Sequence, residues 1–89
     1  MPRISAFYGI VIAMFFDERT HPGRPHFYAT YRGRDVSIDI NSLEILAGVI
    51  APSGLRLLRE WGEAHRGELL ANWERARRGE ALRRIAPLP

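Results

Sequence analysis

The chain has 89 residues, 46% of them hydrophobic, and no cysteine. This predicts one domain with a single core and excludes disulfides, thiolate chemistry and zinc–thiolate sites. All 13 basic residues are arginine and the formal net charge is +3, which suits a nucleic-acid or acidic-protein partner because the guanidinium fork matches phosphate and carboxylate. A GC-rich genome would produce the same choice of arginine, so a solvated, non-binding surface is the alternative.

The first apolar run, residues 10–16, predicts a strand. It is rich in β-branched and aromatic residues, and it lies between Gly9, which marks a bend or a close backbone approach, and the polar loop of residues 17–24. Because every position in the run is apolar, both faces of this strand need cover. We expect a central strand with a helix on one face and, as one candidate, a second chain on the other. Residues 1–8 are expected to form a lead-in that packs under the sheet.

The same run does not predict a membrane segment. Its seven residues are far fewer than the roughly 20 that a membrane-spanning helix needs. Pro2 precedes it, Asp17 and Glu18 end it, and no small-residue cleavage site follows, so the pattern is not that of a signal peptide. We therefore expect this run to be a strand of the mature protein, and the absence of cysteine fits a reducing cytoplasm.

Residues 25–31 predict the second strand, which begins at a proline, a residue tolerated at that position. The period of two places His26, Tyr28 and Thr30 on one face, and the residues between them on the other. The two faces differ in chemistry, because the first carries polar groups and the second is mainly apolar.

A tight turn at residues 32–35, with Gly33 at positive φ, leads to a third strand at residues 36–40. Alternation along this strand predicts that Ser37 and Asp39 face solvent while the apolar residues face the core. Residues 43–46 form a short helical or strand-like piece before Gly48.

Residues 52–79 predict one long amphipathic helix with Ser53 as its N-cap and Gly79 as its C-terminal stop. Gly67 costs about 1 kcal/mol relative to alanine, so a kink there or two shorter helices are alternatives. Apolar and weakly polar residues recur at three- and four-residue steps, which predicts packing on a sheet: Leu55, Leu58, Trp61, Gly62, His65, Leu69, Trp73 and Ala76.

The predicted architecture is therefore α+β, in a single domain over residues 1–89. Residues 1–51 form a small antiparallel sheet of three to four strands, and the long helix at 52–79 packs on one face. Residues 80–89 form a tail that docks through Leu82 and Ile85.

The residues that carry chemistry gather around the second strand. His26 and Tyr28 lie two apart on one strand face, with Cα atoms roughly 6.5–7 Å apart. Histidine acts as a general acid or base near neutral pH, and tyrosine can donate to a developing oxyanion. They are the predicted catalytic pair if the protein is an enzyme, for metal-independent, ribonuclease-like cleavage through the 2′-hydroxyl. The predicted binding residues are those that can hold phosphate or line the same site: Arg24, Tyr31, Arg32, Arg34 and Asp17, with Glu18 and His21 nearby in the loop.

Simpler interpretations stand beside this one. His26 can be a structural histidine, and the tyrosines can be half-buried sheet residues. A metal site from His21, His26 and Asp17 lacks a fixed ligand spacing, so no metal is predicted. The arginine-rich end, residues 75–84, either binds nucleic acid or an acidic partner or is a solvated helix end. No phosphate-binding loop, dinucleotide glycine pattern or nucleophile elbow occurs, so no cofactor is predicted.

Nearly the whole chain carries an ordered set of motifs: Met1-Pro2-Arg3-Ile4, Phe7-Tyr8-Gly9-Ile10, Pro25-His26-Phe27 with Ala29 and Tyr31, and Trp61…His65…Glu68-Leu69…Asn72-Trp73. This set resembles that of one small bacterial family, the domain of unknown function number four-one-six-zero. Two positions depart from its pattern, which is typically Pro-Pro-His-Phe-His-Ala: Arg24 precedes Pro25 here, and Tyr28 stands where the second histidine is usual. A His-x-His pair is therefore absent.

The resemblance implies a cellular context and no defined reaction. Members of the family are small stand-alone proteins, often encoded beside another small protein and commonly described as toxin–antitoxin components. We therefore expect a component of a prokaryotic toxin–antitoxin-like module, with RNA as a candidate target and a small protein as partner. The alternative is a non-enzymatic interaction module (an antitoxin, regulator or inhibitor) that binds a protein through its sheet face and helix. The first strand, apolar on both faces, predicts a homo-oligomer in either case.

Overall fold

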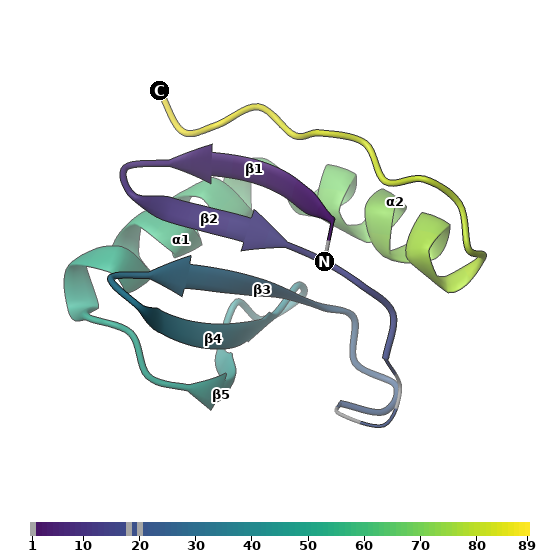
Figure 1. The fold of residues 1–89 in the computed structure, drawn as a ribbon, viewed down its shortest axis with the longest axis horizontal. Coiled ribbons are helices and arrows are strands. Elements are labelled where there is room, and N and C mark those ends of the chain that lie inside the picture. Colours follow the sequence, from purple (N-terminus) through teal and green to yellow (C-terminus); the bar gives the residue numbers. More distant parts are fainter. Residues whose placement is uncertain (1, 18, 20) are drawn as a thin grey trace.

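The computed structural model of the chain describes residues 2–17, 19 and 21–89. The sheet is antiparallel throughout, and its strands lie side by side in chain order from first to last. The predicted α+β class is confirmed, but the predicted three to four strands and single long helix are too few. Within the described residues the chain forms five strands and then two helices (Figure 1): β1 (Arg3–Phe7), β2 (Ile10–Ala13), β3 (His26–Tyr31), β4 (Arg34–Asp39), β5 (Ile45–Gly48), α1 (Pro52–Ala64) and α2 (Arg66–Arg77).

The N-terminal segment is a full strand and not the predicted lead-in. β1 pairs with β2 from the register Phe7↔Ile10 onward. Tyr8 (φ 48°) and Gly9 (φ 80°) form the two-residue turn between the strands, and two positive φ values match the twist of a tight hairpin. A tyrosine seldom adopts a positive φ, so in the sequence only the glycine signals this turn, and a glycine alone indicates no more than a bend.

The same kind of turn joins β3 to β4, at Arg32 (φ 51°) and Gly33 (φ 75°). The predicted positive φ of Gly33 is confirmed. Because the turn takes only two residues, β4 begins at Arg34, two residues earlier than predicted. β5 then forms where a short helical or strand-like piece was predicted, and Leu43 (φ 60°) turns the chain before it.

The predicted helix is divided into α1 and α2 by His65 (φ −121°, ψ 20°). The interruption lies two residues before Gly67, where the sequence indicated a kink or a break. Pro52 opens α1 because the missing N–H of proline is harmless in the first turn. The predicted cap at Ser53 is wrong, since Ala51 occupies the N-cap position and no side chain caps the helix.

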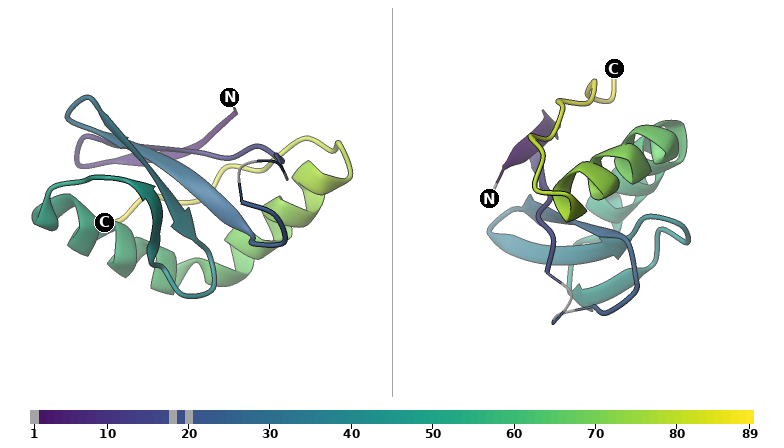
Figure 2. Two further views of the ribbon diagram at one scale, coloured as in Figure 1. Left: turned by 90° about the horizontal axis from the view of Figure 1, so that it is seen from below. Right: turned by 90° about the vertical axis from the view of Figure 1, so that its right-hand side faces the viewer.

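Figure 2 shows two layers, with α1 and α2 lying across one face of the sheet. On this inner face Trp61 is fully buried, and its ring centroid lies 5.3 Å from that of Phe7 and 5.8 Å from that of Phe27. The helix approaches the sheet closely, because a Cβ added at Gly54 would come within 2.6 Å of the Tyr31 ring. Neither of the helices described here is long and apolar enough to cross a membrane.

The tail, residues 80–89, contains no helix or strand but is held against α2 and β1. The fully buried Asn72 donates to the carbonyl of Arg83 (2.8 Å) and accepts from its N–H (2.9 Å). The Ile85 N–H then donates to the Ile4 carbonyl of β1 at 2.8 Å. The tail therefore runs beside the outer edge of β1 (Figure 1), an edge that would otherwise be open to pairing with another chain.

Candidate functional site

The connection between β2 and β3 covers one end of the outer sheet face, the face opposite the helices. Ser37 and Asp39 point to this face yet are only 3% and 5% exposed. The Nε2 atom of His21 lies 2.9 Å from Ser37 Oγ, and Arg24 Nε donates to Asp39 Oδ2 at 3.0 Å. The prediction that Ser37 and Asp39 face solvent is therefore wrong, because two side chains from the preceding loop fold over them.

His26 lies at the centre of this covered end and is fully buried. Its Nδ1 is 2.7 Å from the backbone carbonyl of Arg24, and since a carbonyl only accepts, Nδ1 carries the hydrogen. Its Nε2 is 3.1 Å from the hydroxyl of Tyr28, and in the neutral form of the ring this nitrogen accepts a hydrogen bond from that hydroxyl. Both ring nitrogens are thus engaged within the protein.

Aromatic rings complete the enclosure of His26. The His21 ring meets it edge-on, with centroids 4.8 Å apart and an interplanar angle of 86°. Trp73 of α2 approaches with its ring centroid 4.9 Å from that of His26, so this residue links the helical layer to the covered end. The arrangement joins the loop, β3 and α2 through one imidazole.

The charges at this end are set by hydrogen bonding and burial. Desolvation would raise the pKa of Asp39, but the N–H groups of Ser42 and Asn41, with the Arg24 guanidinium, outweigh it and hold this pKa below its usual value. Burial, then His26 and Arg24, lower the pKa of His21. At neutral pH Asp39 is therefore ionised and His21 is neutral.

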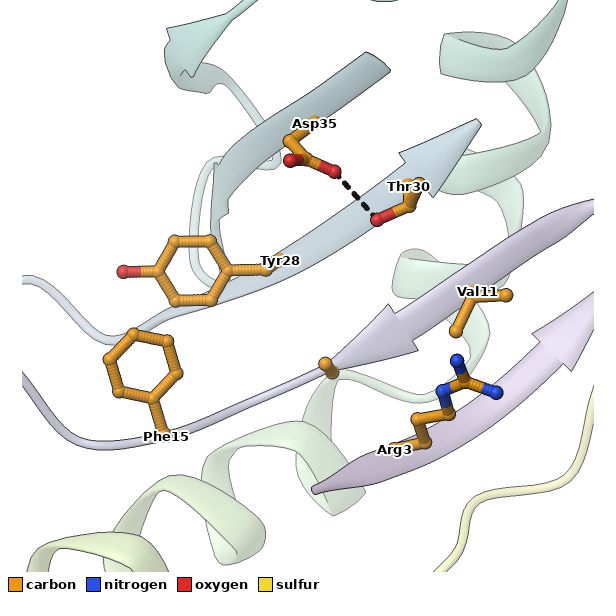
Figure 3. A pocket seen from close by; sticks show the side chains of 7 residues that line it. Arg3, Val11, Phe15, Tyr28, Thr30 and Asp35 are labelled. Carbon is orange, nitrogen blue, oxygen red and sulfur yellow. Dashed lines mark hydrogen bonds between the residues drawn. The ribbon is translucent and has the colours of Figure 1, made fainter. Parts of the chain in front are cut away.

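The rest of the outer face is open and forms a groove of ≈ 680 Å³, shown in Figure 3. Phe15 stacks on Tyr28 at one end, with ring centroids 4.9 Å apart and an interplanar angle of 8°. Arg3 and Asp35 lie on opposite sides of it (Figure 3), and Thr30 donates to Asp35 at 2.7 Å. We call this the sheet groove, and it is lined by Arg3, Val11, Ala13, Phe15, Tyr28, Thr30 and Asp35.

The structure brings together only some of the predicted site residues. His26, Tyr28 and Arg24 lie at the same end of β3. The Arg24 side chain, however, forms an ion pair with Asp39. Asp17 lies in the preceding loop and accepts from Arg19 Nε at 3.3 Å, while Glu18 lies outside the described residues.

The other predicted binding residues are at the opposite end of the hairpin. Tyr31 is buried on the inner face beside Gly54, and Arg32 lies over the Tyr31 ring at 4.9 Å from its centroid. Arg34 pairs with Tyr31 in the register of β3 and β4. The geometry therefore does not place Arg32 and Arg34 beside His26, because they lie at and next to the turn between β3 and β4, at the other end of β3.

Most of the sheet groove was missed at the sequence level, where only Tyr28 was proposed for a site. The apolar run did carry a signal, since alternate positions 11, 13 and 15 share one face and that face was predicted to need cover. Among the described residues no group of three or more histidine, cysteine or acidic side chains could hold a metal ion.

Comparison with known proteins identifies one family. The family model described as Domain of unknown function (DUF4160) matches residues 9–74. The matched span runs from the turn before β2 into α2, and it includes His26 and Tyr28 but not β1 or the tail. No curated protein and no solved structure matches the chain.

Proposed function

This chain belongs to the family Domain of unknown function (DUF4160), and from that premise we propose that it is a protein-binding component of a bacterial toxin–antitoxin-like module. The surface that binds the partner is the sheet groove. The partner is a small protein that inserts an apolar side chain between Val11 and Phe15 and meets Arg3 and Asp35 with charges of opposite sign.

The observation that carries this proposal is the character of the groove. It combines an apolar floor and a stacked aromatic pair with one cation and one anion at its sides. Binding surfaces typically pair an apolar, aromatic centre with a polar rim. One end of the outer face is already covered by the loop before β3, and the groove is the open part of this face that combines these features.

The setting of His26 also favours binding over catalysis. A general base needs a ring nitrogen within reach of a substrate proton, whereas both nitrogens of this buried ring are engaged by Arg24 and Tyr28. The imidazole therefore serves to hold the loop against β3, and that loop in turn shapes one end of the groove.

The test is co-expression with the product of the neighbouring gene, which the family resemblance implies is a small protein, followed by size-exclusion chromatography with light scattering. Val11→Arg fills the groove with a charged side chain and should abolish co-elution. Ala47→Arg adds the same charge at an exposed position of β5 and should leave the complex intact. Co-elution of the Val11→Arg protein at wild-type strength would refute the sheet groove as the binding surface.

One observation supports a second candidate, an RNA-directed activity of the same module. The Tyr28 hydroxyl is hydrogen-bonded to His26 at 3.1 Å, and Tyr28 lines the sheet groove, so this phenol is one of the polar groups that a substrate there would meet. Tyr28→Phe keeps the ring that stacks on Phe15 and removes only the hydroxyl.

Growth after induced expression in a bacterial host separates the two candidates. If the wild type arrests growth and a folded Tyr28→Phe protein does not, the hydroxyl has a catalytic role. Equal arrest by both proteins would exclude that role and leave binding as the mechanism. Circular dichroism of the purified variant provides the control for folding.

A further inference from the structure

The positive charge of this protein is concentrated in one short segment. Residues 74–84 carry five arginines and two glutamates, which is a formal charge of +3, equal to that of the whole chain. The remaining residues carry eight arginines and eight carboxylates and are neutral in sum. A local field of this kind attracts polyanions even when the net charge of the whole protein is modest.

Three of these arginines line one pocket between α2 and the tail. It has a volume of ≈ 170 Å³, and its walls include Arg75, Arg83, Arg84 and Asn72. Glu68 also contributes, but its carboxylate lies 2.6 Å from His65 Nδ1, which engages one of its oxygens. The charge of the lining is therefore positive.

The pocket is built by a fully buried side chain, because Asn72 fixes the tail at this point. Its amide group exchanges two hydrogen bonds with the backbone of Arg83, and its oxygen also accepts from Arg75 Nη1 at 2.9 Å. One asparagine thus sets the positions of an arginine on α2 and of the tail arginines beside it.

Within the described part of the chain, the two guanidinium groups of the tail form no ion pair or hydrogen bond, unlike several other arginines. Arg24 is paired with Asp39, and Arg77 with Glu74 at 2.8 Å. By contrast, the side chains of Arg83 and Arg84 form no hydrogen bond or ion pair with any described residue, and both residues are exposed. Their forks are free to bind an external anion.

We propose that this pocket binds a phosphate group of single-stranded RNA. Guanidinium forks bind phosphate through paired N–H···O bonds. A phosphodiester presents two anionic and two ester oxygens in a tetrahedral arrangement, so three guanidinium groups around one small pocket suit it better than the two coplanar oxygens of a carboxylate. The pocket shares no residue with the sheet groove. A test of RNA binding at the pocket therefore gives no information about protein binding at the groove, and the two proposals can be refuted separately.

The test is fluorescence anisotropy with a labelled oligouridylate at several salt concentrations. The Arg83→Gln/Arg84→Gln variant should bind at least about tenfold more weakly than wild type, since each hydrogen bond to a charged group is a strong one. The slope of log affinity against log salt should also become shallower by about 0.7 for each phosphate that the variant no longer neutralises. Arg83→Lys/Arg84→Lys keeps the charge without the fork and should restore only part of the affinity.

The matched control is Arg19→Gln/Arg56→Gln, which removes the same charge from two exposed arginines outside the pocket. It should bind the probe within about twofold of wild type.

An equal loss of affinity in both double variants would overturn the site, because only net charge would then matter. Polyglutamate bound as tightly as the RNA, with the same sensitivity to the variants, would overturn phosphate as the ligand. Shifts in the NMR signals of the tail on adding inorganic phosphate, without any RNA binding, would overturn RNA as its source.

Discussion

The two faces of the sheet are built from the same strands but are held in different ways. The inner face packs apolar side chains against α1 and α2, with Trp61 fully buried between Phe7 and Phe27. The outer face is covered at one end by polar contacts of His21 and Arg24, and it is open at the other end. Dense apolar packing stabilises the fold, whereas a few hydrogen bonds hold the covered end.

The difference separates stability from recognition. A side chain removed from the inner face leaves a cavity that the surrounding atoms cannot fill. A side chain removed from the sheet groove is replaced by water. The changes below test this contrast, beginning with the largest expected effect.

Trp61→Ala should have the largest effect, a loss of about 3–5 kcal/mol in the free energy of unfolding, because it opens a cavity on the inner face. Phe15→Ala, which removes a half-buried ring from the sheet groove, should cost about 1 kcal/mol. Urea denaturation of both variants provides the measurement. Equal losses would mean that the outer face contributes to stability as much as the core does.

Asp39→Ala tests the covered end and should cost about 2–3 kcal/mol, because it leaves the N–H groups of Asn41 and Ser42 and the Arg24 guanidinium without their acceptor. Asp39→Asn keeps an acceptor oxygen and should cost less.

The pH dependence of stability gives a second measurement on the same carboxylate. Its pKa is lowered in the folded state, so its stabilising contribution is complete above about pH 4 and is lost as the pH falls through the folded value. Wild type should lose this contribution in acid, and Asp39→Asn should not. A variant that titrates like wild type would show that the ion pair and caps contribute nothing.

Two glycine substitutions measure how tightly the inner face is packed. Gly54→Ala should destabilise the protein by about 1–3 kcal/mol, because the new Cβ would lie 2.6 Å from the Tyr31 ring. Gly67→Ala meets no atom within 4 Å and should stabilise the protein by up to about 1 kcal/mol, since alanine favours a helix. Thermal melts that moved in the same direction for both variants would contradict the close approach of α1 to the sheet.

The smallest expected effect concerns His21, whose pKa is lowered in the folded state by burial and by His26 and Arg24. The unfolded chain then binds the proton more readily, so stability should fall as the pH drops from about 6.5 toward the folded value. His21→Gln removes this titration, and the difference between the two proteins isolates it from the other histidines. Identical pH profiles in denaturant melts would show that this ring does not couple to folding.

The turns show how far local sequence predicts the fold. Gly33 predicted a tight hairpin, and the structure confirms it. Gly9 also takes a positive φ in a two-residue hairpin turn. The sequence did not predict β1, however, because Tyr8, the other residue of that turn, gives no signal for a positive φ. The break in the helix is similar, since Gly67 indicated the region but His65 is where the helix ends. Local preferences locate such features to within a few residues, and packing decides the exact position.

The sequence by itself determined the α+β class, the alternation along β3 and β4, the apolar stripe of the helices and the family. These follow from local periodicity and from motifs that are read directly along the chain. Only the tertiary structure decided that Ser37 and Asp39 are buried and that Arg24 forms an ion pair with Asp39. It also placed Arg75 in one pocket with the arginines of the tail. Each of these depends on contacts between residues far apart in the chain, and side-chain spacing carries no information about which distant partner a polar group will find.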